Sequence, residues 1–260
     1  MEHSDRYARG LERLNTLNPA GGARVQESLR DIAPDFGRLM IEFGYGDLLT
    51  RPGLDMKARQ IATTAALAGM GNAQPQLRFH IGASLNAGCS PDEIVEILYI
   101  VAVFAGFPAA LNSLTAAKEE FSLRGVSPAA PASSGHAQKD RRQRGLDALE
   151  ATSAGAGQAV LDSLADIAPD MAGFILDFSY GDVISRTELS PRHKEIAMIA
   201  IATASGVMRP QLMVHIRAAL HVGVTRQEII EVIMQMAGYS GFPSALNGLS
   251  AAREAFADAP

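Results

Sequence analysis

The chain has 260 residues, of which 47% are hydrophobic and 20% charged, and its formal net charge is −5 at pH 7. This length suggests about two domains, and the composition is that of a well-packed globular protein. The acidic balance disfavours nucleic-acid binding, which requires a basic surface. The single cysteine, Cys89, excludes an internal disulfide and any motif that needs paired cysteines.

The first residues lead into no apolar stretch, so we expect no signal peptide. The longest apolar run, over 94–105, is interrupted by Glu96. It is also shorter than the ~20 residues that span a bilayer, which predicts a buried core helix. We therefore expect a cytoplasmic protein that contacts neither membranes nor nucleic acids.

The two halves of the sequence match each other without a gap at an offset of 135 positions, which carries His80 onto His215. Tyr-Gly-Asp at 45–47 recurs at 180–182, and Gly-Phe-Pro at 106–108 recurs at 241–243. Such a unit exceeds the ~20–50 residues of a solenoid repeat, so each copy should be a small domain. We predict one repeat over 1–124, a Pro/Ala/Ser linker over 125–138 and a second repeat over 139–260, docked as a pseudo-two-fold dimer.

Each repeat is predicted to be all-helical, because the period-2 runs typical of strands are absent. Amphipathic helices over 5–17 and 140–151 come first, with leucines three positions apart. A second helix opens at Pro34 or Pro169 and ends near Tyr-Gly-Asp, for which we favour a structural role in a turn. An Ala-rich helix over 55–70, mirrored at 191–205, follows.

The next helix, over 75–87 and 210–222, carries the repeated histidine and ends at Gly88 or Gly223, each suited to a left-handed conformation. A capping box at 90–93 and 225–228 then starts another helix. That helix is almost wholly apolar and should be central. Gly-Phe-Pro breaks it before a last helix.

The candidate chemistry centres on His80 and His215. Gln76 and Gln211 precede them by four positions and share their helix face. A core histidine bonded to a helix carbonyl is the alternative. Retention in both repeats favours a functional ring, since imidazole can donate or accept a proton near neutral pH.

Glu195 and Gln60 occupy matched positions in the preceding helices. If those helices pack antiparallel to the histidine helices, Glu195 reaches His215 and orients or polarises its ring. The alternative is a carboxylate that only stabilises the positive end of its helix. Gln60 carries no charge, so the site of the first repeat should be weakened or altered.

Arg51 and Arg186 lie in matched loops. An arginine held there can bind a substrate carboxylate in bidentate fashion, and a solvated surface arginine is the alternative. No metal-ligand spacing recurs in both repeats, and no Gly-rich phosphate loop is present. We therefore predict neither a metal nor another cofactor.

The order of these motifs resembles the carboxymuconolactone decarboxylase family, which also contains the AhpD-like alkylhydroperoxidases. The resemblance is carried by Arg-Pro-Gly-Leu-Asp at 51–55, His80, Leu-Asn-Ala-Gly at 85–88, Glu-Ile-Val-Glu at 93–96 and Gly-Phe-Pro-Ala-Ala-Leu-Asn at 106–112. The second repeat matches from His215 to Asn247. The resemblance covers most of both repeats and implies the AhpD-like helical fold.

The peroxidase branch of that family has the pattern Cys-x-x-Cys-x-x-x-His. Its two cysteine positions hold Ala73 and Gln76 in the first repeat and Met208 and Gln211 in the second. Without a thiolate there is no nucleophile for a peroxide, so a thiol peroxidase is disfavoured.

The resemblance to the decarboxylase branch implies cofactor-free decarboxylation of a small lactone carboxylic acid, as in the conversion of 4-carboxymuconolactone to the β-ketoadipate enol-lactone. We predict His215 as the proton donor, Glu195 as its partner, and His80 as a parallel or degenerate site. Four further residues are expected to bind the substrate: Arg186, Arg51, Gln211 and Gln76.

Single-repeat members of that branch assemble into rings, which suggests a trimer of tandem chains here. Two alternatives keep the fold and change the function. One is an isomerase or lyase acting on another enolisable substrate; the other is a binding protein without catalysis. Apolar substrates would make Arg51 and Arg186 dispensable, whereas anionic substrates would not.

Overall fold

The computed structural model describes residues 5–19, 21–129, 140–153 and 156–257. Within these ranges the chain is helical and has no strand, which confirms the all-α prediction. The predicted linker over 125–138 begins after the helix that ends at Arg124, and its residues from 130 onward lie outside the described ranges.

The helices of the first repeat are α1 (Asp5–Leu17), α2 (Gly21–Ser28), α3 (Pro34–Met40), the π-helix η1 (Ile41–Leu48), α4 (Met56–Met70), α5 (Gln74–Asn86) and α6 (Pro91–Arg124). Those of the second are α7 (Arg141–Ser153), α8 (Ala156–Asp162), α9 (Pro169–Phe174), the π-helix η2 (Ile175–Ile184), α10 (Pro191–Ser205), α11 (Arg209–His221), α12 (Arg226–Gln235), the 3₁₀-helix η3 (Met236–Gly238) and α13 (Phe242–Ala257). The two halves follow the same order, with α6 of the first matched by α12, η3 and α13 of the second, which confirms two homologous domains.

In each repeat the second helix does not end at the glycine of Tyr-Gly-Asp as predicted. It continues as a π-helix for two residues or more beyond that glycine. Its glycine packs against the preceding amphipathic helix so closely that a Cβ at Gly181 would lie 2.6 Å from the Arg141 carbonyl oxygen. The adjacent Asp182 carboxylate pairs with the Arg141 guanidinium, as Asp47 pairs with Arg6 in the first repeat. The Gly and Asp of Tyr-Gly-Asp are therefore structural.

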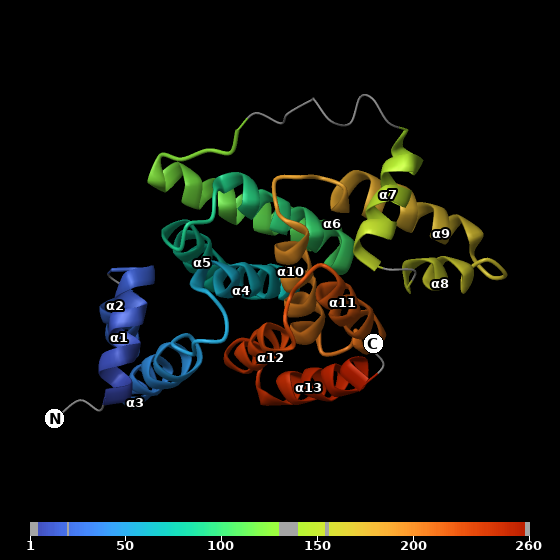
Figure 1. Ribbon diagram of the computed structural model, residues 1–260. Coiled ribbons are helices and arrows are strands. Elements are labelled where there is room, and N and C mark those ends of the chain that lie inside the picture. The colour runs from blue at the N-terminus through green and yellow to red at the C-terminus, as the bar shows by residue number, and fades with distance from the viewer. Residues whose placement is uncertain (1–4, 20, 130–139, 154–155, 258–260) are drawn as a thin grey trace.

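The Ala-rich helices α4 and α10 cross side by side at the centre of the molecule and join the two repeats (Figure 1). Their small side chains permit this close approach: Ala65 and Ala200 are fully buried, and a Cβ at Gly69 would lie 2.8 Å from Ile201. The remaining helices flank this pair on both sides (Figure 1), in a pseudo-two-fold arrangement.

Both predicted capping boxes form, at Ser90 with Glu93 and at Thr225 with Glu228. The predicted break also occurs: Gly106 has φ of 85° inside α6, and its twin Gly241 has φ of 88°.

By length and composition alone α6 could cross a membrane. The break at Gly106 and the burial of its first half in the core are features of a core helix.

Candidate active site

The structure brings His215 and Glu195 together, as expected if their two helices pack against each other. The Nδ1 atom of His215 lies 2.9 Å from Oε2 of Glu195, across the contact between α11 and α10. An ionised carboxylate can only accept a hydrogen bond, so Nδ1 carries hydrogen and Nε2 is the nitrogen left to exchange a proton. Glu195 is 1% exposed, whereas His215 is only half-buried.

A cavity of about 670 Å³ opens beside this pair. Most of its lining is apolar and comes from η2, α9, α10 and α11 of the second repeat. The first repeat closes one wall with 102–104 of α6, and the Phe104 ring centroid lies 5.2 Å from that of His215. The polar side chains among the lining residues are Ser179, Tyr180, Glu195, Gln211 and His215.

Gln211 lines the cavity one helical turn before His215, and its role in binding the substrate stays a prediction. Tyr180 also lines it, and burial together with the negative charge of Glu195 raises the pKa of Tyr180 to about 12. The Tyr180 hydroxyl is therefore a neutral group that can donate a hydrogen bond.

The equivalent position in the first repeat is closed. His80 is 4% exposed, and its Nδ1 lies 2.9 Å from Oε1 of Gln60, so the ring has an amide partner in place of a carboxylate. Burial lowers the pKa of His80 to about 3. The ring is thus neutral at physiological pH and is a poor proton donor there.

Two aromatic rings enclose His80. Those of Phe79 and Tyr239 lie edge-on to it, at centroid distances of 5.1 Å and 5.3 Å. Val214 and Phe104 occupy the twin positions around His215. Gln76 lines a hollow between the repeats with Tyr239, but His80 is not among the residues that line it.

Arg51 is placed in an ion pair between the repeats and not beside either histidine. Its guanidinium makes bidentate contact with Glu231 of α12, with Nη2 2.8 Å from Oε1. Buried Arg59 binds the other oxygen at 3.0 Å. Burial favours protonation of Glu231, but the two arginines outweigh it and hold the pKa of that carboxyl below its usual value.

Arg186 makes the twin contact in the second repeat. Its Nε donates to Oε1 of Glu96 in α6 at 2.7 Å, and its guanidinium lies 4.7 Å from the Tyr99 ring centroid. The pKa of Glu96 is raised because burial outweighs this single arginine. In both repeats, the guanidinium that we predicted to bind a substrate carboxylate is paired with a glutamate of the chain itself. The role of Arg51 and Arg186 in substrate binding stays a prediction.

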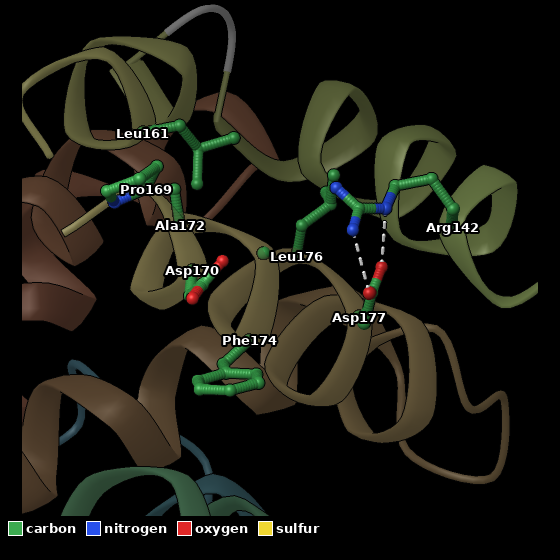
Figure 2. Close-up of a pocket in the computed structure, with 9 residues that line it drawn as sticks. Arg142, Leu161, Pro169, Asp170, Ala172, Phe174, Leu176 and Asp177 are labelled. Carbon is green, nitrogen blue, oxygen red and sulfur yellow. Dashed lines mark hydrogen bonds and ion pairs between the residues drawn. The ribbon is translucent and has the colours of Figure 1, made fainter. Parts of the chain in front are cut away.

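A separate hollow of about 340 Å³ lies among α7, α8, α9 and the start of η2 (Figure 2). Arg142 of α7 reaches across it to Asp177 at 2.6 Å, while Phe174 points away from it (Figure 2). Since no residue of α10 or α11 lines it, this hollow is distinct from the candidate site.

The family model for the carboxymuconolactone decarboxylase family matches the chain twice, over residues 34–119 and 169–254. Each match opens at the proline that starts the second predicted helix and includes the repeated histidine. The chain therefore belongs to this family, as a tandem member.

Two similar proteins are named decarboxylases. The chain is 33% identical over 129 residues to a 4-carboxymuconolactone decarboxylase of Acinetobacter baylyi, covering 49% of this chain and 96% of that protein. It is 32% identical over 98 residues to a nitrosuccinic acid decarboxylase of Metarhizium robertsii, covering 36% and 67%. A third, peroxisomal protein 2 of Schizosaccharomyces pombe, is 30% identical over 155 residues, covering 58% and 68%. The two relatives named as decarboxylases, together with the family match, support a decarboxylase-like protein.

Sequence reasoning missed the carboxylates Glu96 and Glu231 and underrated Tyr180. A signal for the carboxylates was present, because both repeats keep a glutamate inside an otherwise apolar helix. A buried carboxylate needs a cationic partner, and the arginines kept in both repeats were the candidates.

Proposed function

We propose that this protein is a cofactor-free decarboxylase that acts on a small carboxylic acid by acid–base chemistry, at one site per chain. The observation that carries the proposal is the hydrogen bond between His215 and Glu195 on the wall of the interdomain cavity. The family membership and the two relatives named as decarboxylases support the reaction type.

In the proposed reaction, the carbon–carbon bond to the substrate carboxylate breaks and CO₂ leaves. The electron pair remains on the adjacent carbon and spreads onto a conjugated carbonyl oxygen as an enolate. Protonated His215 then delivers its Nε2 proton to the carbon next to that carbonyl, which leaves the double bond at the carbon that lost CO₂, and the ring regains a proton from water. Glu195 holds the ring in the required orientation and compensates its positive charge while it carries both protons.

The apolar lining favours this reaction. A carboxylate is better solvated in water than in an apolar cavity, while the enolate spreads its charge over several atoms. The hydrogen-bonding group of Gln211 lies in the same lining, where it can orient the substrate. The first repeat supplies a wall of this cavity through Phe104, and its own histidine, His80, is not among the residues that line the hollow between the repeats.

For the substrate, we propose a small lactone carboxylic acid of the 4-carboxymuconolactone type, in the breakdown of an aromatic compound. The name of the Acinetobacter relative supports this choice. A second candidate function is isomerisation of another enolisable substrate. It is favoured by the placement of Arg51 and Arg186, whose guanidinium groups bind Glu231 and Glu96 and not the cavity.

A homo-oligomer, with a trimer of tandem chains as its simplest form, also remains our proposal. Exposed apolar side chains occur at twin positions of the two repeats: Phe107 and Phe242 are 61% and 59% exposed, and Leu111 and Leu246 are 62% and 64% exposed. Apolar patches kept in both repeats are typical of surfaces that associate. We likewise propose a cytoplasmic location.

The proposal is tested by incubating the purified protein with 4-carboxymuconolactone and following CO₂ release. The control carries both His80→Ala and His215→Ala. We expect release by the native protein and loss of release by the double variant, with unchanged helix content by circular dichroism. Equal release by a folded double variant would remove the histidines from the mechanism. Absence of release by the native protein would contradict the proposed decarboxylation of this substrate.

A further inference from the structure

We infer that Tyr180 is a catalytic residue whose hydroxyl donates a hydrogen bond to the substrate oxygen that becomes negatively charged in the reaction. The inference rests on the proposed function, since it concerns the enolate formed at the His215 site. It adds a second polar group that acts at this site, for which the sequence favoured only a structural role in a turn.

The placement of Tyr180 depends on the π-helix η2. The Ser185 N–H donates to the Tyr180 carbonyl oxygen at 2.9 Å, five residues back, as in π-helical geometry. The next residue, Gly181, is pressed against the Arg141 backbone of α7, which fixes this turn against a neighbouring helix. The turn is thus anchored on its outer side by Gly181 and Asp182, while Tyr180 lines the cavity.

The hydroxyl of Tyr180 is available to a ligand. In the described part of the chain it makes no hydrogen bond to another residue, although it lies among the residues that line the cavity. Burial and the charge of Glu195 keep it protonated at physiological pH. A neutral O–H beside a mostly apolar lining binds an oxygen that gains negative charge more strongly than the uncharged carbonyl oxygen it develops from.

This property suits the electron flow of the proposed reaction. When the bond to CO₂ breaks, negative charge appears on the carbonyl oxygen, and a hydrogen bond from Tyr180 stabilises it. The Tyr180 proton stays on its own oxygen, and the proton that ends on carbon comes from His215. Tyr180 therefore lowers the barrier to forming the enolate, while His215 completes the product.

The chain provides its own matched control in Tyr45, the twin of Tyr180. Tyr45 lies in the π-helix η1 and is 8% exposed, beside the enclosed His80 site. Burial and the neighbouring Tyr239 raise the pKa of Tyr45. Tyr45→Phe removes the same hydroxyl from the same type of helix, at the site that we propose to be inactive.

The experiment compares Tyr180→Phe with Tyr45→Phe in two assays. The first is CO₂ release from 4-carboxymuconolactone. The second is exchange of the carbon-bound proton of the enol-lactone product with D₂O, followed by NMR, which reaches the same enolate without decarboxylation. We expect Tyr180→Phe to lower kcat by ~10²-fold, as for loss of one donor to an oxyanion. KM should change far less, exchange should slow in parallel, and Tyr45→Phe should leave both rates within about twofold of the native values.

The other possible results show which of the two proposals is wrong. Native rates of release and exchange in Tyr180→Phe would overturn the inference and leave the decarboxylase proposal standing. Exchange without CO₂ release by the native protein would overturn decarboxylation, and the effect of Tyr180→Phe on exchange would still decide the inference. If the native protein catalyses neither process, both proposals are overturned.

Discussion

The two histidines of this chain occupy equivalent positions in homologous repeats but lie in different surroundings. His215 is half-buried, has a carboxylate partner and lines an open cavity. His80 is buried, has an amide partner and is enclosed by two rings. A residue kept in both repeats can therefore lose the ability to carry a second proton in one of them, because its neighbours determine whether it can do so.

The contacts between the repeats differ much less than the two histidine sites. Each repeat contributes a loop arginine that pairs with a buried glutamate of the other repeat, Arg51 with Glu231 and Arg186 with Glu96. The interface has therefore kept its pseudo-symmetry while the sites have diverged. This difference is expected if the first repeat serves mainly to complete the cavity of the second.

Substitution of the two histidines should have very different effects on kcat. His215→Gln should lower kcat for decarboxylation by ~10²–10⁴-fold, the usual contribution of a general acid or base. His80→Gln should stay within about twofold of the native rate, because that ring has no access to the cavity. Steady-state CO₂ release measures both, and equal losses in the two variants would contradict the assignment of the working site to His215.

The next effect concerns stability and compares the two ion pairs. Glu231→Ala leaves Arg59, which is 1% exposed, without its carboxylate, and should cost about 3–5 kcal/mol of unfolding free energy. Glu96→Ala should cost less, because Arg186 is more exposed and can turn toward water. Urea denaturation of both variants provides the values. A larger loss in Glu96→Ala would contradict the described difference in burial.

A smaller effect on rate is expected when His215 is given a glutamine partner, as His80 has in the first repeat. Glu195→Gln should lower kcat by roughly tenfold to hundredfold, less than loss of the ring itself, since the amide still orients His215 but no longer compensates its charge. Thermal unfolding checks that the variant is folded. An unchanged pH–rate profile in this variant would show that the carboxylate does not act through the ring.

The smallest effect is a pH dependence of stability from His80. Its pKa is about 3 in the folded protein and ordinarily 6.5. Below pH 6.5 the unfolded state therefore binds a proton that the folded state does not, so stability is full above this pH and falls as pH decreases toward 3. The contribution at pH 5 is roughly 2 kcal/mol. Urea unfolding at pH 7 and pH 5 should show a smaller loss in His80→Gln than in the native protein.

The sequence was sufficient to predict the helical fold, because the signals are local. The capping boxes at Ser90 and Thr225 and the breaks at Gly106 and Gly241 were all confirmed. The contact of Glu195 with His215 could also be predicted, since it needs only two neighbouring helices to pack side by side. The π-helices and the short helices α2 and α8 were not predicted, because they depend on packing and carry no distinctive period.

The buried glutamates indicated that arginines kept in both repeats are their partners, but spacing could not assign which arginine pairs with which glutamate. Arg51 and Glu231 are brought together only when the two repeats dock. The closure of the first site was equally hidden. Gln60 at the position of Glu195 indicated that the first repeat lacks the carboxylate. The enclosure of His80 by Phe79 and by Tyr239 of the other repeat arises only in the assembled domains.

The most direct test of a single working site per chain is the stoichiometry of ligand binding. Isothermal titration of the native protein with the enol-lactone product should give one bound molecule per chain, and His80→Gln should leave this number unchanged. Two equivalent molecules per chain, one of them lost in His80→Gln, would contradict the account.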